Sequence, residues 1–234
     1  MTLSAQRNRL SIVLIAAVSF TTIATLKTNA AIVTVNDSGS WINGADTLAN
    51  QGFNLIPVPN GAEAVGTDLS TLNSPLGEIG FSPSVNKRQI GNGWLTWSNG
   101  YQGEVYFTNG VPTLDIKLPN LAAFDFYAEP DVFNPFTISA VAQSGKTSDV
   151  LSQVVNGNAG AKYFGFYSDD PLDLIQSIQI TADPGSNGFA IAQMRGAKAT
   201  VPTPLLLPGF IGFGLGLWRK ARSRRQAQNS QDQS

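Results

Sequence analysis

Short segments of alternating hydrophobic and polar residues recur through residues 31–199, separated by clusters of Gly, Pro, Asn, Asp and Ser. Such alternation is typical of antiparallel strands that bury one face and expose the other, and the clusters between them are typical of turns. In the segment 104–108, Val105 and Phe107 share the face predicted to be buried, whereas Tyr106 falls on the exposed face. The predicted strands are Ile32–Val35, Phe53–Ile56, Trp94–Trp97, Glu104–Thr108, Leu114–Leu118, Ala122–Ala128, Phe136–Ala142, Asp149–Val155, Lys162–Tyr167, Ile175–Thr181 and Phe189–Met194.

Residues 36–92 show the weakest alternation and hold many turn-forming residues. We expect long loops there, with one helical turn between Gly66 and Glu78 that begins at Asp68 or Ser70. The remaining pattern predicts an all-β fold, a sandwich or a barrel, built as one domain over residues 31–199.

The N-terminal residues have the pattern of a secretory signal peptide. Arg7 and Arg9 precede an apolar stretch from Leu10 to Ile23, and small residues lead up to Ala30. We predict a signal helix within residues 1–30 and cleavage after Ala30. The alternative is an uncleaved anchor helix, but the apolar stretch is short for a span of about 20 residues.

The C-terminal part has a proline-containing opening, an apolar segment and a basic end. Leu205 to Trp218 would cover about 21 Å as a helix, which is short for a hydrocarbon core of about 30 Å. A buried core segment is disfavoured, because the basic residues that follow would have no partners there. We predict a linker, a short transmembrane helix and a basic membrane stop over residues 200–225, then a disordered polar tail over 226–234. The basic stop consists of Arg219, Lys220, Arg222, Arg224 and Arg225.

The near-neutral total charge hides an acidic central region between two basic ends. Residues 31–200 carry 15 acidic and 7 basic side chains, a net charge of −8. This excess disfavours nucleic acid as a partner, because phosphate binding requires basic side chains. The chain has no Cys and no His, which excludes disulfides, Ser-His-Asp and Cys-His catalysis, and zinc sites built on those ligands.

The C-terminal part resembles the PEP-CTERM sorting tail, in its PTPA-like variant. The resemblance rests on the apolar segment, the Arg-rich end and a proline motif formed by Val201, Pro202, Thr203 and Pro204. Thr203 stands in place of the usual Glu, and Leu205 in place of the usual Ala. The resemblance implies that an exosortase, a membrane-embedded processing enzyme, recognises this motif and removes the tail. It also implies an exported protein, anchored transiently in the inner membrane before it reaches the envelope, the outer surface or the extracellular matrix.

Three segments of the second half resemble the jelly-roll module that often precedes such tails. They are LAAFDFY at 121–127, KYFGFYSDDPLDLIQSIQITAD at 162–183 and GFAIAQ at 188–193. The resemblance covers about residues 95–197 and implies an antiparallel jelly-roll-type β-sandwich. The chain departs from the module at Ala192 and Gln193, where the module has Asp and Asn.

Aromatic side chains near Asn and Gly residues are candidates for binding sugar rings. An aromatic ring covers the C–H face of a sugar, while neighbouring amides bond its hydroxyls. Trp94 and Trp97 would point to opposite faces of a strand, so at most one is predicted to be exposed on that sheet. The alternative is that one fills the core and the other is incidental surface. The ligand-binding candidates are Trp94, Trp97, Tyr101 and Trp41.

Two acidic groups are candidates for metal binding or catalysis. Asp169, Asp170 and Asp173 fall within five residues and could contribute oxygen ligands to Ca²⁺; the alternative is a turn started by Asp before Pro. The second group is Asp125, Glu129 and Asp131. A hydrolase would need two carboxylates about 5–10 Å apart across a cleft, and the sequence singles out no such pair.

We therefore predict a non-enzymatic protein of the cell envelope or extracellular matrix, associated with exopolysaccharide and handed over by an exosortase. The first alternative is a carbohydrate-binding module with a discrete glycan site. The second is a secreted hydrolase that uses a carboxylate pair. No cofactor is predicted apart from the calcium candidate, and no nucleic-acid partner is expected.

Overall fold

The computed structural model describes residues 32–36, 48–145 and 147–199 of the chain. Several predictions concern residues outside these ranges: the signal peptide cleaved after Ala30, the aromatic candidate Trp41, and the sorting tail with its apolar segment and basic stop. Within the described ranges, no helix has the length and apolar character needed to cross a membrane.

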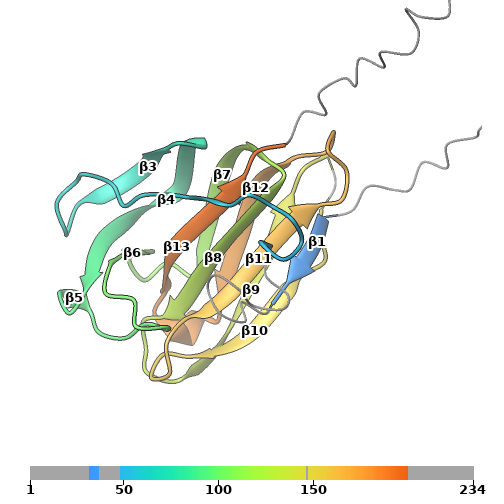
Figure 1. The fold of residues 1–234 in the computed structure, drawn as a ribbon. Helices are drawn as coiled ribbons and strands as arrows, with labels where there is room; N and C mark the ends of the chain where they lie inside the picture. Colours follow the sequence, from blue (N-terminus) through green and yellow to red (C-terminus); the bar gives the residue numbers. More distant parts are fainter. Residues whose placement is uncertain (1–31, 37–47, 146, 200–234) are drawn as a thin grey trace, which may run out of the picture.

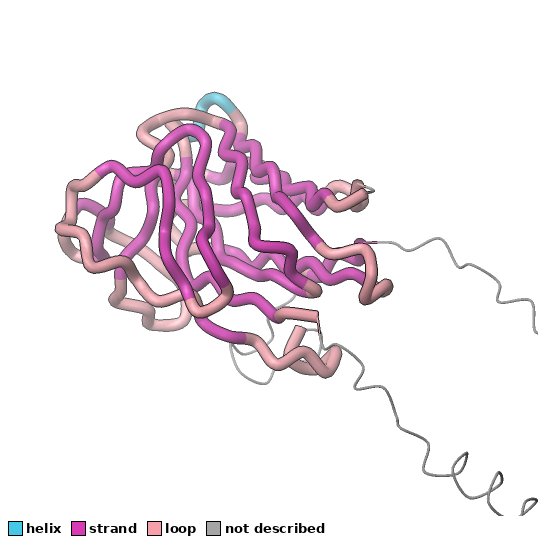
Figure 2. Tube along the Cα trace, turned by 90° about the horizontal axis from the view of Figure 1, so that it is seen from above, coloured by secondary structure: helices cyan, strands magenta, loops and turns pink. Residues whose placement is uncertain are grey.

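The described residues form thirteen strands and one short 3-10 helix, η1 (Figures 1 and 2). They pair in the order β1-β11-β8-β13-β6-β4-β7-β12-β9-β10, with β2 added to β13 and both β3 and β5 added to β4. All pairs along this order are antiparallel, which confirms the predicted all-β class. The elements are β1 (Ile32–Val35), β2 (Ile56–Pro57), β3 (Asp68–Ser74), β4 (Gly77–Ile90), β5 (Gly93–Trp94), β6 (Glu104–Phe107), β7 (Thr113–Leu121), β8 (Ala123–Pro130), β9 (Pro135–Gln143), β10 (Leu151–Asn156), β11 (Lys162–Ser168), β12 (Ile175–Ala182), η1 (Pro184–Ser186) and β13 (Phe189–Ala197).

The sheet folds back on itself around one main core. In Figure 1, a front layer with β13, β8, β11 and β1 lies over β7, β12, β9 and β10. Strand β4 joins the two layers, because Asn86–Arg88 pair with β6 and Gly80–Ser82 pair with β7. Strand β10 contacts β8 and β11 across the remaining gap, so the sheet is nearly closed. The core draws side chains from both layers; the rings of Phe126 and Phe164 stack there at 5.4 Å.

Strand β8 is buried on both of its faces. Phe124 and Phe126 point into the main core, whereas Tyr127 on the opposite face belongs to a second cluster. That cluster includes Leu48 and the partly buried Phe53, so the segment before β2 covers the outside of β8. This covering layer turns the outer face of the strand into a second interior.

The predicted pattern of one buried and one exposed face holds for some strands only. It is confirmed in β12, where buried Ile180 follows exposed Gln179. It is wrong in β6, where Tyr106 is 1% exposed. The Tyr106 ring packs on Phe81 at a centroid distance of 6.0 Å, and its hydroxyl accepts a hydrogen bond from the Gly61 amide at 3.2 Å.

The prediction of loops and a helical turn in residues 66–90 is wrong, because this region forms β3 and β4. Strand β4 does alternate, with Phe81 and Val85 buried on one face. The next position on that face is Lys87, whose charge masks the pattern in the sequence. The buried charge is accommodated because Lys87 Nζ lies 2.8 Å from a carboxylate oxygen of Glu104.

Two predicted strands are much shorter in the structure. Of the segment 53–56, only Ile56 is in a strand, as the first residue of β2. Of the segment 94–97, only Trp94 is in a strand, as the last residue of β5. The residues after Trp94 form a loop, and that loop builds the candidate site.

Candidate functional site

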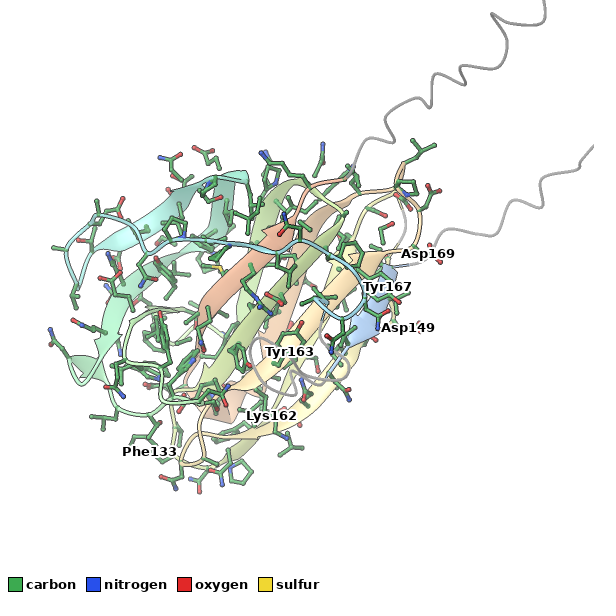
Figure 3. All side chains as sticks on the ribbon, in the orientation of Figure 1. Phe133, Asp149, Lys162, Tyr163, Tyr167 and Asp169 are labelled. Carbon is green, nitrogen blue, oxygen red and sulfur yellow. The ribbon has the colours of Figure 1, made fainter. Side chains whose placement is uncertain are left out.

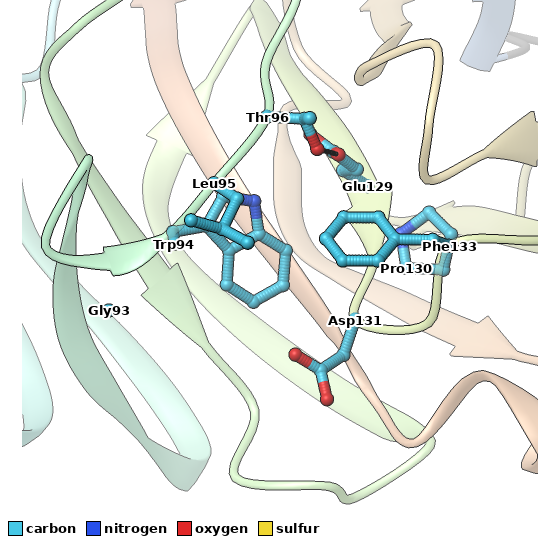
Figure 4. A pocket seen from close by; sticks show the side chains of 8 residues that line it. All are labelled: Gly93, Trp94, Leu95, Thr96, Glu129, Pro130, Asp131 and Phe133. Carbon is cyan, nitrogen blue, oxygen red and sulfur yellow. Dashed lines mark hydrogen bonds between the residues drawn. The ribbon is translucent and has the colours of Figure 1, made fainter.

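A pocket of about 170 Å³ lies at the end of β8. The Trp94 indole and the Phe133 ring stand on opposite sides of it (Figure 4). Glu129 and Thr96 lie at one end, and the Asp131 carboxylate lies at the other (Figure 4). The lining is Gly93, Trp94, Leu95, Thr96, Glu129, Pro130, Asp131 and Phe133.

Trp94 is placed by a tight turn between β4 and β5. Gly91 and Gly93 adopt φ angles of 83° and 86°, which a residue with a side chain rarely takes. The Gly91 amide donates to the Trp94 carbonyl oxygen at 2.7 Å and closes the turn. The indole then packs on Phe107 at a ring-centroid distance of 5.5 Å, so that Trp94 is only 5% exposed.

The loop after Trp94 is fixed by side-chain hydrogen bonds to distant parts of the chain. The Thr96 hydroxyl donates to the Gly157 carbonyl oxygen at 2.8 Å. Two residues later, the Ser98 hydroxyl donates to the Ala161 carbonyl oxygen at 2.5 Å. These bonds anchor one wall of the pocket to the loop between β10 and β11.

The opposite wall is the loop that carries Phe133. The Asp131 amide donates to the Gly188 carbonyl oxygen at 3.2 Å, which ties this loop to the start of β13. Gly157 approaches it so closely that an added Cβ would lie 2.5 Å from the Val132 carbonyl oxygen. Both walls of the pocket therefore contact the same residue, Gly157.

Glu129 is a buried carboxyl group at the base of the pocket. It is 1% exposed; Oε1 hydrogen bonds with the Thr96 hydroxyl, and Oε2 has no hydrogen-bond partner. Burial raises the pKa of Glu129 to about 7, although the neighbouring Thr96 hydroxyl and Trp94 indole act in the opposite direction. The group is therefore poised between its acid and its ionised form near neutral pH, with one buried oxygen that has no hydrogen-bond partner.

The lining carries negative charge and no basic side chain. Asp131 is the second acid, and its Oδ2 accepts a hydrogen bond from the Asn187 side chain at 2.6 Å. Arg88 comes near but does not line the pocket. Its guanidinium lies 4.0 Å from the centre of the Phe107 ring and donates to the Gly93 carbonyl oxygen at 3.3 Å. Cationic ligands or neutral donors suit this lining better than anions.

The structure separates the aromatic candidates predicted from the sequence. Trp94 lines the pocket, whereas Trp97 and Tyr101 do not. They lie near each other, with ring centroids 6.2 Å apart, and the Trp97 indole donates to the Gln193 side chain at 2.8 Å. Gln193 has a φ of 53°, in the left-handed region that Asn tolerates better.

The first acidic group makes the contacts of a turn. Asp170 Oδ1 accepts from the Leu172 amide at 2.8 Å, and its carbonyl accepts from the Asp173 amide at 3.1 Å. The Asp173 carboxylate accepts from the Gly145 amide at 3.1 Å. Neither these residues with Asp169 nor any other three Asp or Glu side chains in the described ranges come together as a group suited to a metal. The calcium candidate thus has no geometric support in this part of the chain.

The second acidic group is divided between two environments. Asp125 is buried, accepts from Arg195 Nε at 3.0 Å and accepts from the Tyr163 hydroxyl at 3.0 Å. Its burial raises its pKa, against the effect of the arginine. Asp125 is four residues from Glu129 along β8, about 13 Å in an extended strand, so the two cannot act on one sugar linkage. Only Glu129 and Asp131 share the pocket.

Sequence reasoning missed Phe133, Leu95 and Thr96. The sequence held one signal for Phe133. This large aromatic residue stands in a turn-forming segment, directly before Asn134 and a proline, and such a position predicts an exposed ring. Phe133 is indeed 42% exposed and Leu95 71% exposed, and both border the pocket. No feature of the sequence indicated that Thr96 contacts Glu129, which is 33 positions away along the chain.

Comparisons with known proteins identify no family. No protein-family model matches the chain. No curated protein matches it either. Among solved structures, the C-terminal CBM6 of LamC, a marine laminarinase from Zobellia galactanivorans, is 18% identical; the match covers 55% of this chain and 99% of that chain, with a TM-score of 0.11. A likeness at this level carries no argument, so the functional conclusion rests on the pocket.

Proposed function

We propose that this protein is a non-enzymatic surface or matrix domain that binds a residue of a polysaccharide between Trp94 and Phe133. The observation that carries the proposal is the pair of rings on either side of a cavity whose lining includes Glu129, with one buried carboxyl oxygen that has no hydrogen-bond partner. Rings supply apolar cover for a sugar and the carboxyl takes its donors. A volume of about 170 Å³ is below the roughly 300 Å³ of sites for drug-sized ligands, which favours one sugar unit.

The rigidity of the site supports a binding role. Thr96, Ser98 and Gly157 hold the two walls through backbone and side-chain hydrogen bonds before any ligand arrives. A pre-formed site loses little conformational entropy on binding, so weak individual contacts suffice for measurable affinity.

The position of the pocket suits a protein displayed on a surface. Val33 lies opposite Tyr167, Tyr167 opposite Ala123, and Ala123 opposite Ala197, so both ends of the described fold lie in one row of the sheet. Glu129 is six residues further along β8, about 20 Å from that row. Phe133 accordingly lies far from the exits of the two chain ends in Figure 3. A C-terminal anchor would thus point the pocket away from the membrane.

The finer parts of the proposal follow the sequence resemblance. We assign the two layers to the jelly-roll type of sandwich. We also expect export through the signal peptide, transient anchoring in the inner membrane by the C-terminal segment, and processing by an exosortase. Exopolysaccharide of the envelope or matrix is the expected partner.

Retention on immobilised polysaccharides tests the binding proposal. Phe133→Ala removes one wall at an exposed position and should weaken retention about tenfold, which corresponds to about 1.4 kcal/mol. Leu172→Ala is the matched control, because Leu172 is 92% exposed and lies outside the pocket. Equal retention of the wild type and both variants across a broad glycan panel would overturn the proposal.

One observation favours a second candidate, a glycoside hydrolase. Glu129, protonated near neutral pH, and Asp131 share a pocket, and a general acid with a second carboxylate is the usual pair for cleaving a glycosidic bond. Release of reducing ends that is abolished by Glu129→Gln would favour this candidate. Binding without any release of reducing ends would favour the non-enzymatic domain.

A further inference from the structure

The pocket combines three features that together select for one kind of substituent on the bound sugar. Glu129 Oε2 is buried and has no partner, so a donor must reach it to remove the cost of its burial. Asp131 adds a second acid to the lining, and no basic side chain lines the cavity. Uronic acids and sulfated sugars are therefore disfavoured, because their charge would meet two carboxyl groups.

The aromatic walls add a further preference. A cation near the face of a Trp or Phe ring is attracted by the ring's electrons, an effect that grows when water is excluded. Phe133 offers such a surface and the Trp94 indole borders the cavity opposite it, while Arg88, which donates to the carbonyl oxygen of the lining residue Gly93, is held over Phe107. The net charge of −8 over residues 31–200 also draws cations toward the domain.

We propose that the pocket recognises a protonated amino sugar, with the ammonium group bonded to Glu129 Oε2 between the two rings. This inference rests on the proposed polysaccharide-binding function and names its ligand class. An ammonium provides three donors and a full charge, whereas a sugar hydroxyl provides one donor and no charge. The ammonium therefore gives the unpartnered oxygen a donor and balances the negative charge of the lining, whereas a neutral sugar does not balance that charge.

The burial of Glu129 also favours a cationic ligand. An isolated ionised carboxylate is costly in this site, and the raised pKa of Glu129 reflects that cost. An ammonium ligand supplies the missing counter-charge and favours the ionised form. Glu129→Gln keeps the size of the side chain but cannot ionise, so it cannot pair with an ammonium charge.

Three hexasaccharides with one β-1,4 backbone test the proposal, since they differ only at C2: glucosamine hexamer with ammonium, chitin hexamer with acetamide, and cellohexaose with hydroxyl. Calorimetric titration would use the full-length chain in detergent at pH 6. We expect the glucosamine hexamer to bind about tenfold or more tightly than the other two, as hydrogen bonds to charged groups allow. Glu129→Gln should abolish this preference, and Leu172→Ala should retain it.

Each of the other outcomes overturns either the ammonium preference alone or the polysaccharide-binding function as well. Cellohexaose binding as tightly as the glucosamine hexamer would overturn the ammonium preference and leave the polysaccharide-binding function standing. Absence of binding to every sugar on the broad glycan panel would overturn both. If hexalysine binds as tightly as the glucosamine hexamer, the site recognises an amine without its sugar, and the amino-sugar proposal is overturned. If Glu129→Gln melts much earlier than the wild type, Asp131→Asn serves as the second variant, and an unchanged preference there would contradict the role given to the acidic lining.

Discussion

The Thr96 hydroxyl hydrogen bonds with the buried Glu129 carboxyl and also donates to the Gly157 carbonyl oxygen, 61 residues away along the chain. A hydroxyl has one proton, and a carbonyl oxygen only accepts. The one hydroxyl proton is therefore shared between the Glu129 carboxyl and the Gly157 carbonyl oxygen. The two contacts tie the loop after β5, strand β8 and the loop after β10 into one support for the pocket.

Replacement of Thr96 by Val should destabilise the fold by about 1–3 kcal/mol, because the buried Glu129 oxygen and the Gly157 carbonyl both lose their partner. It should also raise the pKa of Glu129 further, since the Thr96 hydrogen bond lowers that pKa. Urea denaturation measures the stability. Thr96→Ser keeps the hydroxyl and should lie close to the wild type; equal stability of all three proteins would mean that the hydrogen bonds contribute nothing.

Glu129 should make the protein less stable as the pH rises. Its pKa is about 7 in the folded state and 4.5 as a free side chain, so the unfolded state loses the proton first between these values. At about 1.4 kcal/mol per pKa unit, the loss approaches about 3 kcal/mol, reached above pH 7. Glu129→Gln removes this effect.

The measurement is the free energy of unfolding of the wild type and Glu129→Gln from pH 4 to pH 8. The two proteins should have similar stability near pH 4.5, and the variant should be the more stable one at pH 8. Other groups with shifted pKa, such as Asp125, contribute to both proteins and cancel in the difference. Parallel curves would mean that Glu129 has an ordinary pKa in the fold.

The local alternation was sufficient to predict most strands of the fold, because a strand with one buried face shows that face as alternating hydrophobic residues in its own sequence. In the second half of the chain, strands such as β12 are visible as Ile178 and Ile180 two positions apart. Strand β4 was missed because Lys87 occupies a buried position whose charge is offset by Glu104, a partner 17 residues away. The pocket was missed for the same kind of reason: Thr96, Glu129 and Gly157 become neighbours only through the pairing of distant strands. Local pattern carries no information on such contacts.

Gly157 should be intolerant of any side chain. A Cβ there would lie 2.5 Å from the Val132 carbonyl oxygen and 3.2 Å from that of Pro130, so the loop that carries Phe133 must move. We expect Gly157→Ala to cost about 1–3 kcal/mol in stability and to weaken retention on polysaccharide as Phe133→Ala does.

Gly145→Ala provides the matched control for Gly157→Ala. The nearest atom to its added Cβ is a carboxylate oxygen of Asp173 at 3.4 Å, an ordinary contact. Its stability and retention should match those of the wild type. If Gly157→Ala behaves like this control, the two walls of the pocket do not depend on their close approach.

The buried pair of Asp125 and Arg195 should stabilise the fold only while both partners are present. Arg195→Met leaves a buried carboxylate without its counter-charge and should cost about 3–5 kcal/mol. The double variant Asp125→Leu with Arg195→Met removes both charges and should recover most of that loss. Thermal unfolding of the single and double variants measures the difference; a double variant as unstable as the single one would mean that the pair also supplies geometry that apolar packing does not replace.

Processing at both ends should leave the fold intact, because the predicted sites lie just outside it. Ile32, the first residue of β1, is buried and follows Ala30 by two positions, while β13 ends at Ala197, before the motif that begins at Val201. We expect the protein recovered from the envelope and the medium of its producing cell to begin near Ala31 and to end near residues 201–205, as intact mass spectrometry measures. Replacement of Pro202 and Pro204 by Ala should leave the tail uncut. A wild-type mass that retains residues 210–234 would instead mean that the C-terminal segment is a permanent anchor.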